Sequence, residues 1–249
     1  MGVKDCGGLA WLIEESELPE GARVLAVGPG VYDFASGPQP PMDIGLLTLL
    51  SHPHTKSVTV LDLPPDCSEG GMHNCLQVKD YLDMLREKGA GFAPYSFIQG
   101  DIFDERNPIG AFDAIHDHMT WFWAYPQGKE KRMLLSATGD DVRFDLLAKR
   151  YHGLLSPGGK AFLYNTFDAT DEKTTKILSA LERQGFSTEM HSGLEDCYPL
   201  SDPVLTADLT QDSICDNVFL KKLPGRYNIL KDGLARPFHS ASSLIVARR

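Results

Sequence analysis

Three apolar runs in the sequence each end in residues suited to holding a nucleoside. The run "VLAV" (24–27) stops at Gly28 and Gly30, whose missing Cβ lets a ligand come up against bare backbone. The run "SVTVLD" ends in Asp62, a carboxylate that can accept hydrogen bonds from both hydroxyls of an adenosine ribose. Asp101 follows "FIQG", where it can accept from the exocyclic amine of adenine while Ile102 packs on the ring. We therefore expect a nucleoside-binding site built from these strand ends.

A fourth run, "FDAIHDH", carries two histidines near its end. Strand side chains alternate between faces, so His116 and His118 are predicted to share one face and Asp117 the other. His118 lies beyond the strand end and is the predicted catalytic base, because histidine exchanges protons near neutral pH. His116 lies deeper and is predicted to contact the ligand. The alternative, that both are polar residues at the edge of the core, stays open.

Aromatic side chains follow the histidines directly. We predict that they line a substrate pocket and exclude water from it, with the core as the alternative location; they are Trp121, Trp123 and Tyr125. Their segment, 120–138, is one of three that look inserted, together with 35–41 and 192–236. The segment 192–236 is predicted to be a cap over the site, within a single domain that spans residues 1–249.

Short apolar runs alternate with longer amphipathic stretches, which is typical of βαβ units. The predicted strands are 23–27, 57–62, 95–99, 112–116, 160–164, 186–190 and 240–247. The fold class is therefore predicted to be α/β, with a doubly wound, mostly parallel, seven-stranded Rossmann-like sheet, an antiparallel last strand and an inserted cap. In such sheets ligands bind at the carboxyl ends of the strands, where the run ends described above would meet.

The composition of the chain indicates which classes of binding partner to expect. The net charge of −10 opposes binding to nucleic acid and to anionic membranes. Five scattered cysteines are typical of reduced thiols, and no apolar window reaches the roughly 18 residues of a membrane span. We expect a cytoplasmic protein with a small-molecule substrate, and a homodimer is left open. Cys67, His73 and Cys75 match no zinc pattern, so no metal is expected.

Five short stretches, in a fixed order along the chain, carry a resemblance to a known family: "LPEGARVLAVGPG" (18–30), "VTVLDL" (58–63), "GDIFD" (100–104), "FDAIHDH" (112–118) and "LLSPGGKAFLYN" (154–165). With the closing "SSLIVARR", they make the sequence similar to the class I S-adenosylmethionine-dependent methyltransferases. The resemblance implies S-adenosylmethionine as cofactor. It also implies that Tyr32 and Leu63 join the cofactor-binding residues named above.

The sequence departs from this family in three places. Ala26 stands where the family usually has an acid in the first strand, two residues before the first glycine. The stretch from Gly30 to Asp62 is longer than the usual gap. No "NPPY"-like tetrapeptide follows the fourth strand, where enzymes that methylate amino groups of nucleic acids carry one. The last difference favours a small-molecule substrate.

Two functions of different class remain. The first is direct in-line methyl transfer from S-adenosylmethionine to an oxygen or nitrogen of a small molecule. The second is a cofactor-binding protein that does not methylate, either a pseudo-enzyme or a partner subunit, which Ala26 favours. A nicotinamide-dependent oxidoreductase is a weaker third reading, because Asp33 stands where the dinucleotide fingerprint has a glycine.

Overall fold

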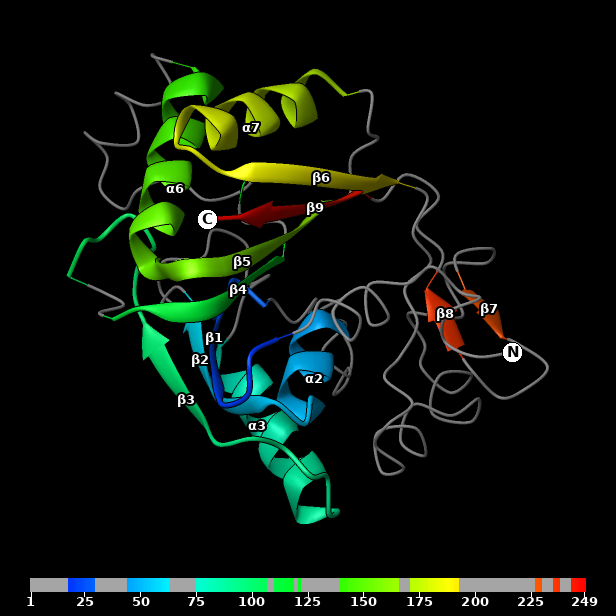
Figure 1. The fold of residues 1–249 in the computed structure, drawn as a ribbon. Helices are drawn as coiled ribbons and strands as arrows, with labels where there is room; N and C mark the ends of the chain where they lie inside the picture. Colours follow the sequence, from blue (N-terminus) through cyan, green and yellow to red (C-terminus); the bar gives the residue numbers. More distant parts are fainter. Residues whose placement is uncertain are drawn as a thin grey trace.

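The chain folds as a three-layer α/β structure in a computed structural model (Figure 1). The structure describes residues 18–29, 44–62, 75–106, 110–118, 121, 139–165, 171–192, 227–229, 235–237 and 243–249. The main sheet has seven strands in the order β3-β2-β1-β4-β5-β9-β6. Their bounds are β1 Ala22–Val27, β2 Thr55–Asp62, β3 Tyr95–Gln99, β4 Phe112–His118, β5 Leu155–Asn165, β6 Ser187–Ser192 and β9 Ser243–Arg248.

The sheet topology confirms the predicted fold class. β1 pairs in parallel with both β2 and β4, and β2 and β4 continue the parallel pairing to β3 and β5. β9 lies between β5 and β6 and is antiparallel to both. The chain therefore reverses its direction of winding between β1 and β4. In open α/β sheets, ligands bind in the crevice outside the carboxyl ends of the strands at this point.

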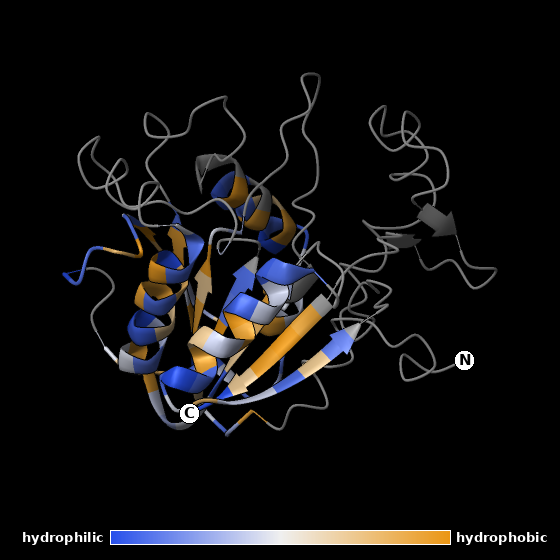
Figure 2. Cartoon of the chain, turned by 90° about the horizontal axis from the view of Figure 1, so that it is seen from above, coloured by the Kyte–Doolittle hydropathy of each residue, from blue (hydrophilic) through white to orange (hydrophobic). Residues whose placement is uncertain are grey.

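Among the described residues, four helices cover the two faces of the sheet: α2 Ile44–Ser51, α3 Cys75–Glu87, α6 Asp140–Leu154 and α7 Glu172–Arg183. Alternate strand residues supply two separate hydrophobic clusters. Val24 and Ala26 of β1 belong to the cluster with α2 and α3, whereas Leu25 and Val27 belong to the cluster with α6 and α7. Figure 2 shows hydrophobic central strands between helices that carry both hydrophobic and hydrophilic residues.

The predicted strands are confirmed, and the largest difference is at β5. This strand follows α6 directly and begins at Leu155, five residues before the predicted start at Lys160. The phrase "SPGG" does not end the pairing, because the register moves from Phe112–Leu155 to Ala114–Lys160 through an irregularity. Gly158 has φ +79° there, a conformation that favours glycine. The glycines therefore let the chain bulge and rejoin β4.

A second, two-stranded antiparallel sheet lies at the end of the predicted cap region and extends one residue past it. It consists of β7 Tyr227–Ile229 and β8 Ala235–Pro237. The other residues of segment 192–236, apart from Ser192, lie outside the described residues, so the cap and the single-domain organisation stay predictions. Of the helices that the structure describes, none is both long enough and apolar enough to span a membrane.

Candidate active site

The ends of β1, β2 and β3 are tied together by backbone hydrogen bonds. The N–H of Gly28 donates to the carbonyl of Leu61, and the N–H of Gly100 donates to the carbonyl of Asp62, both at 2.9 Å. Gly28 has φ +59°, which lets the chain turn away as soon as β1 ends. The three turns at this edge are therefore held in one place, as the sequence predicted.

Asp62 is the last residue of β2 and only 6% exposed. It pairs in register with Gln99 of β3, so it lies where the strand meets the turns. A buried carboxylate is costly unless hydrogen-bond donors surround it. Two adjacent hydroxyl groups of a ligand, such as those of a ribose, are donors of the right kind for this position.

Asp101 opens the turn that follows β3. Its Oδ1 accepts a hydrogen bond from the N–H of Phe103 at 3.0 Å, and its carbonyl accepts from the N–H of Asp104 at 2.9 Å. A carboxylate offers about four acceptor positions, so the bond to Phe103 does not exhaust it. Ile102 is 4% exposed and packs in the cluster on the α6 face. The predicted contact of Ile102 with an adenine ring stays a prediction.

His116 is fully buried in the middle of the sheet. Its neighbours in register are Ala26 on β1 and Phe162 on β5. His116 therefore lies beside position 26, where the family that the sequence resembles usually has an acid. β4 runs to His118, two residues past the predicted strand end at His116, so the prediction that His118 lies beyond the strand is wrong and His118 is the strand's last residue; its side chain lies outside the described residues.

Asp117 faces the opposite side of the sheet, as predicted. The hydroxyl of Tyr151, on α6, donates a hydrogen bond to Oδ2 of Asp117, and both side chains are fully buried. Burial raises the pKa of the Tyr151 phenol well above its usual range, and the nearby charge of Asp117 raises the pKa further. The sequence predicted the face of Asp117 and missed its partner, although Tyr151 lies on the apolar stripe of α6.

Trp121 is 3% exposed. Its ring lies 5.7 Å from the ring of Phe144 and 5.7 Å from that of Tyr151, both on α6. These contacts are with the hydrophobic core, and a role for Trp121 in a substrate pocket stays a prediction. The other predicted site residues lie outside the described residues; they are Gly30, Tyr32, Leu63, Trp123 and Tyr125.

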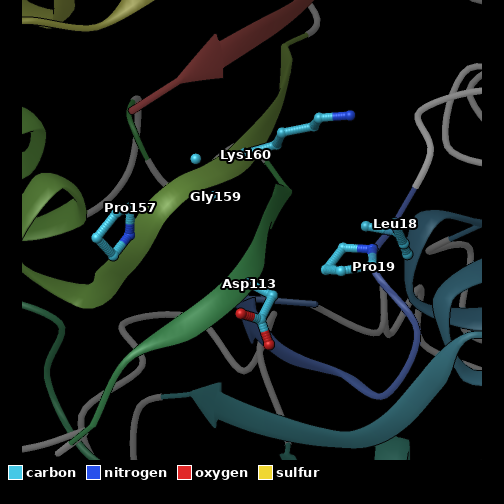
Figure 3. A pocket seen from close by; sticks show the side chains of 7 residues that line it. Leu18, Pro19, Asp113, Pro157, Gly159 and Lys160 are labelled. Atoms are coloured by element: carbon cyan, nitrogen blue, oxygen red, sulfur yellow. The ribbon is translucent and has the colours of Figure 1, made fainter.

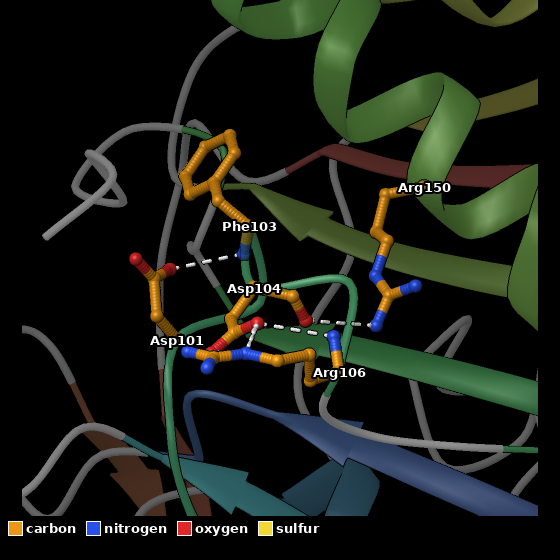
Figure 4. Close-up of polar contacts among 5 residues, drawn as sticks. All are labelled: Asp101, Phe103, Asp104, Arg106 and Arg150. Atoms are coloured by element: carbon orange, nitrogen blue, oxygen red, sulfur yellow. Dashed lines mark hydrogen bonds and ion pairs between the residues drawn. The ribbon is translucent and has the colours of Figure 1, made fainter. Parts of the chain in front are cut away.

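Arg150, also on α6, is a residue of this edge that sequence reasoning missed. Its Nε donates to the carbonyl of Ile102 and its Nη2 to the carbonyl of Asp104, each at 3.1 Å. Figure 4 shows Arg150 and Asp101 on opposite sides of the turn. At the end of this turn, Arg106 forms an ion pair of 2.7 Å with Asp104.

A pocket of about 250 Å³ lies at the opposite, amino edge of the sheet (Figure 3). Its lining residues are Leu18, Pro19, Asp113, Pro157, Gly158, Gly159 and Lys160. Oδ2 of Asp113 accepts a hydrogen bond of 2.9 Å from the N–H of Arg23, which supports the start of β1. This pocket is distinct from the candidate site.

Among the described residues, no group of three or more acidic, histidine or cysteine side chains could hold a metal ion.

Comparisons with known proteins identify the fold. No protein-family model and no curated protein matches the sequence. The structure is similar to precorrin-6y C5,15-methyltransferase from Geobacter metallireducens, with a TM-score of 0.50 at 12% identity over 96% of this chain and 87% of that one. It is equally similar to the N-methyltransferase NodS from Bradyrhizobium japonicum in complex with S-adenosyl-L-homocysteine, with a TM-score of 0.50 at 12% identity over 96% and 83%.

The chain has the class I methyltransferase fold. The [4+2]-cyclase SpnF is also similar, with a TM-score of 0.50 at 16% identity over 97% of this chain and 79% of that one. Identities this low establish the class I fold and leave the reaction to be argued from the site.

The described residues fit the adenosyl part of S-adenosylmethionine. Asp62 and Asp101 place two carboxylates at neighbouring strand ends of the class I fold, and carboxylates can accept hydrogen bonds from ribose hydroxyls and from an adenine amine. The turn at Gly28 lets the backbone lie close to the ligand. Ala26 supplies no carboxylate to accept a hydrogen bond from an ammonium group, whereas the family that the sequence resembles usually has an acid at this position.

Proposed function

We propose that the protein is an S-adenosylmethionine-dependent methyltransferase that methylates an oxygen or nitrogen of a small molecule. The observation that carries the proposal is the juncture of β1, β2 and β3. There Gly28, Asp62 and Asp101 lie on turns that two backbone hydrogen bonds tie together. Similarity to solved methyltransferases of the same fold supports it.

Each residue of the juncture has a separate task in this proposal. Asp62 accepts hydrogen bonds from the ribose hydroxyls, and Asp101 accepts one from the adenine amine. S-adenosylmethionine supplies, when bound, a methyl group on a sulfonium whose departure leaves a neutral thioether. The protein then contributes chiefly by placing the acceptor and excluding water. His118, at the end of β4, removes the proton of an oxygen acceptor.

A small-molecule acceptor is supported by charge. The net charge of −10 opposes the phosphate backbone of a nucleic acid, whose binding is dominated by electrostatic attraction. The aromatic side chains that follow β4 are proposed to exclude water around the acceptor; they are Trp121, Trp123 and Tyr125.

A second candidate function is cofactor binding without methylation. Ala26 favours it, because no acid stands at this position of β1 and the fully buried His116 lies beside it instead. Such a protein would be a pseudo-enzyme or a partner subunit of an active enzyme. The structural similarity to a cyclase agrees with the general rule that proteins of one fold can catalyse different reactions.

Two experiments distinguish the two functions: the first measures cofactor binding and the second measures methyl transfer to an acceptor. Calorimetric titration with S-adenosylhomocysteine should show binding to the unaltered protein. Asp62→Ala and Asp101→Ala should each weaken it by about 1.5–3 kcal/mol, the usual cost of losing a hydrogen bond to a charged group, which is a factor of roughly 10 to 150. Asp80→Asn, which changes an exposed carboxylate on α3, is the matched control and should bind like the unaltered protein.

A screen of hydroxyl- and amine-bearing acceptors then follows release of S-adenosylhomocysteine from S-adenosylmethionine. Release that depends on an acceptor supports the methyltransferase. Binding without release under every acceptor supports the second candidate. If both aspartate variants bind as tightly as the control, the assignment of the cofactor site is wrong.

A further inference from the structure

The turn after β3 is supported by Arg150 of α6. Arg150 is half-buried, and its guanidinium donates to the carbonyls of Ile102 and Asp104, which lie 48 and 46 residues away in the sequence. These two carbonyls flank Phe103, whose N–H bonds to the side chain of Asp101. The guanidinium therefore holds the turn on one side while the Asp101 carboxylate caps it on the other (Figure 4).

An arginine is suited to this task. Its guanidinium is planar and presents donors in a fixed fork, so two of them can reach two carbonyls of one turn at once. Lysine carries its donors on one flexible nitrogen and cannot reproduce this geometry. Burial lowers the pKa of Arg150. The nearby carboxylates of Glu105 and Asp104 stabilise the charged guanidinium and oppose that shift.

We propose that Arg150 is a positioning residue for the adenine end of the cofactor. By holding the carbonyls of residues 102 and 104, Arg150 fixes the turn whose first residue is Asp101. The Asp101 carboxylate then keeps the direction needed to accept from the adenine amine. This inference rests on the proposed function, and Arg150 itself has no contact with the ligand in it.

A purely structural role for Arg150 makes a different prediction. If Arg150 only joined α6 to the sheet, its loss would lower the stability of the fold and weaken every ligand of the site to the same extent. A positioning role changes selectivity, because the Asp101 carboxylate recognises one group of the base. The amine of adenine is the group that distinguishes the two roles.

The test compares two ligands with each variant. S-adenosylhomocysteine carries the amine, and S-inosylhomocysteine carries a ring carbonyl in its place. Titration of the unaltered protein should favour S-adenosylhomocysteine by about tenfold or more, a typical effect of one charge-assisted hydrogen bond. Arg150→Met should weaken S-adenosylhomocysteine by roughly tenfold and bring the ratio of the two dissociation constants close to one.

Two further variants serve as controls for this comparison. Arg150→Lys keeps the charge and the aliphatic stem, so it should fold and still lose most of the selectivity. Arg183→Met removes another arginine that donates from Nε and Nη2, at 3.0 and 2.8 Å, to the single acceptor Asp145 Oδ1 on the surface. It should leave both affinities unchanged.

The outcomes separate the two proposals. Loss of selectivity in both Arg150 variants, with no further loss when Asp101→Ala is added to Arg150→Met, supports the positioning role. Equal weakening of both ligands, or unchanged binding, overturns it while the proposed cofactor site stands. Absence of S-adenosylhomocysteine binding by the unaltered protein overturns the proposed function and this inference with it.

Discussion

The hydrogen bond between Tyr151 and Asp117 should be worth far more than a similar bond elsewhere in the same protein. In Tyr151→Phe the ring is kept, so its packing on Trp121 is retained and only the hydroxyl is lost. Asp117 is fully buried and loses a donor that water cannot replace. Hydrogen bonds to charged groups contribute about 1.5–3 kcal/mol, and a buried acceptor that loses its donor lies at the upper end. We expect the free energy of unfolding to fall by about 3 kcal/mol.

Tyr95 supplies a control with the same chemistry. Its hydroxyl donates to Oδ1 of Asp83 at 2.6 Å, but the Asp83 side chain is 40% exposed and Tyr95 is only half-buried. Water can replace the lost donor there, so Tyr95→Phe should cost less than about 1 kcal/mol. Urea denaturation of both variants, followed by circular dichroism, measures the two losses. Equal losses, or a larger loss for Tyr95→Phe, would refute the reasoning that burial sets the strength of this bond.

Two more predictions concern stability. Burial raises the pKa of Tyr151 well above the usual value, and that of Tyr95 to about 12, so stability should be complete below about pH 10 and fall above it, where the unfolded chain releases these protons first. Tyr151→Phe should flatten the decline by about 0.7 kcal/mol per pH unit on average, measured by urea denaturation between pH 9 and 11, and an unchanged slope would contradict this. Asp171 caps α7 by accepting from the N–H of Lys173 at 2.8 Å, so Asp171→Ala should cost about 1 kcal/mol, against no loss if the cap is dispensable.

β1 and β2 could be predicted because each has a short apolar run that ends at a glycine or a charged residue. β1 and β2 begin within two residues of their predicted starts and end where predicted, at Val27 and Asp62. β5 was different. "SPGG" is typical of a turn, and the pairing of Leu155 with Phe112 is a tertiary contact that no local pattern encodes.

The candidate site also contains both residues that could be predicted from the sequence and residues that could not. Gly28, Asp62 and Asp101 were predictable because parallel strands bring their carboxyl ends to one edge, so position at the end of a run is sufficient. Arg150 and Tyr151 were not predictable. Their partners are 34 to 48 residues away, and the contacts depend on how α6 packs against the sheet.

Arg150 and Tyr151 give α6 a role beyond covering the core. Consecutive helical residues point about 100° apart, since there are 3.6 residues in a turn. Tyr151 can therefore reach inward to Asp117 of β4 while Arg150 reaches the turn after β3. In the proposed site, that turn holds the adenine end and the end of β4 faces the acceptor. In that proposed site α6 contacts the elements at both ends, so we expect a displacement of α6 to change the positions of the cofactor and of the acceptor together.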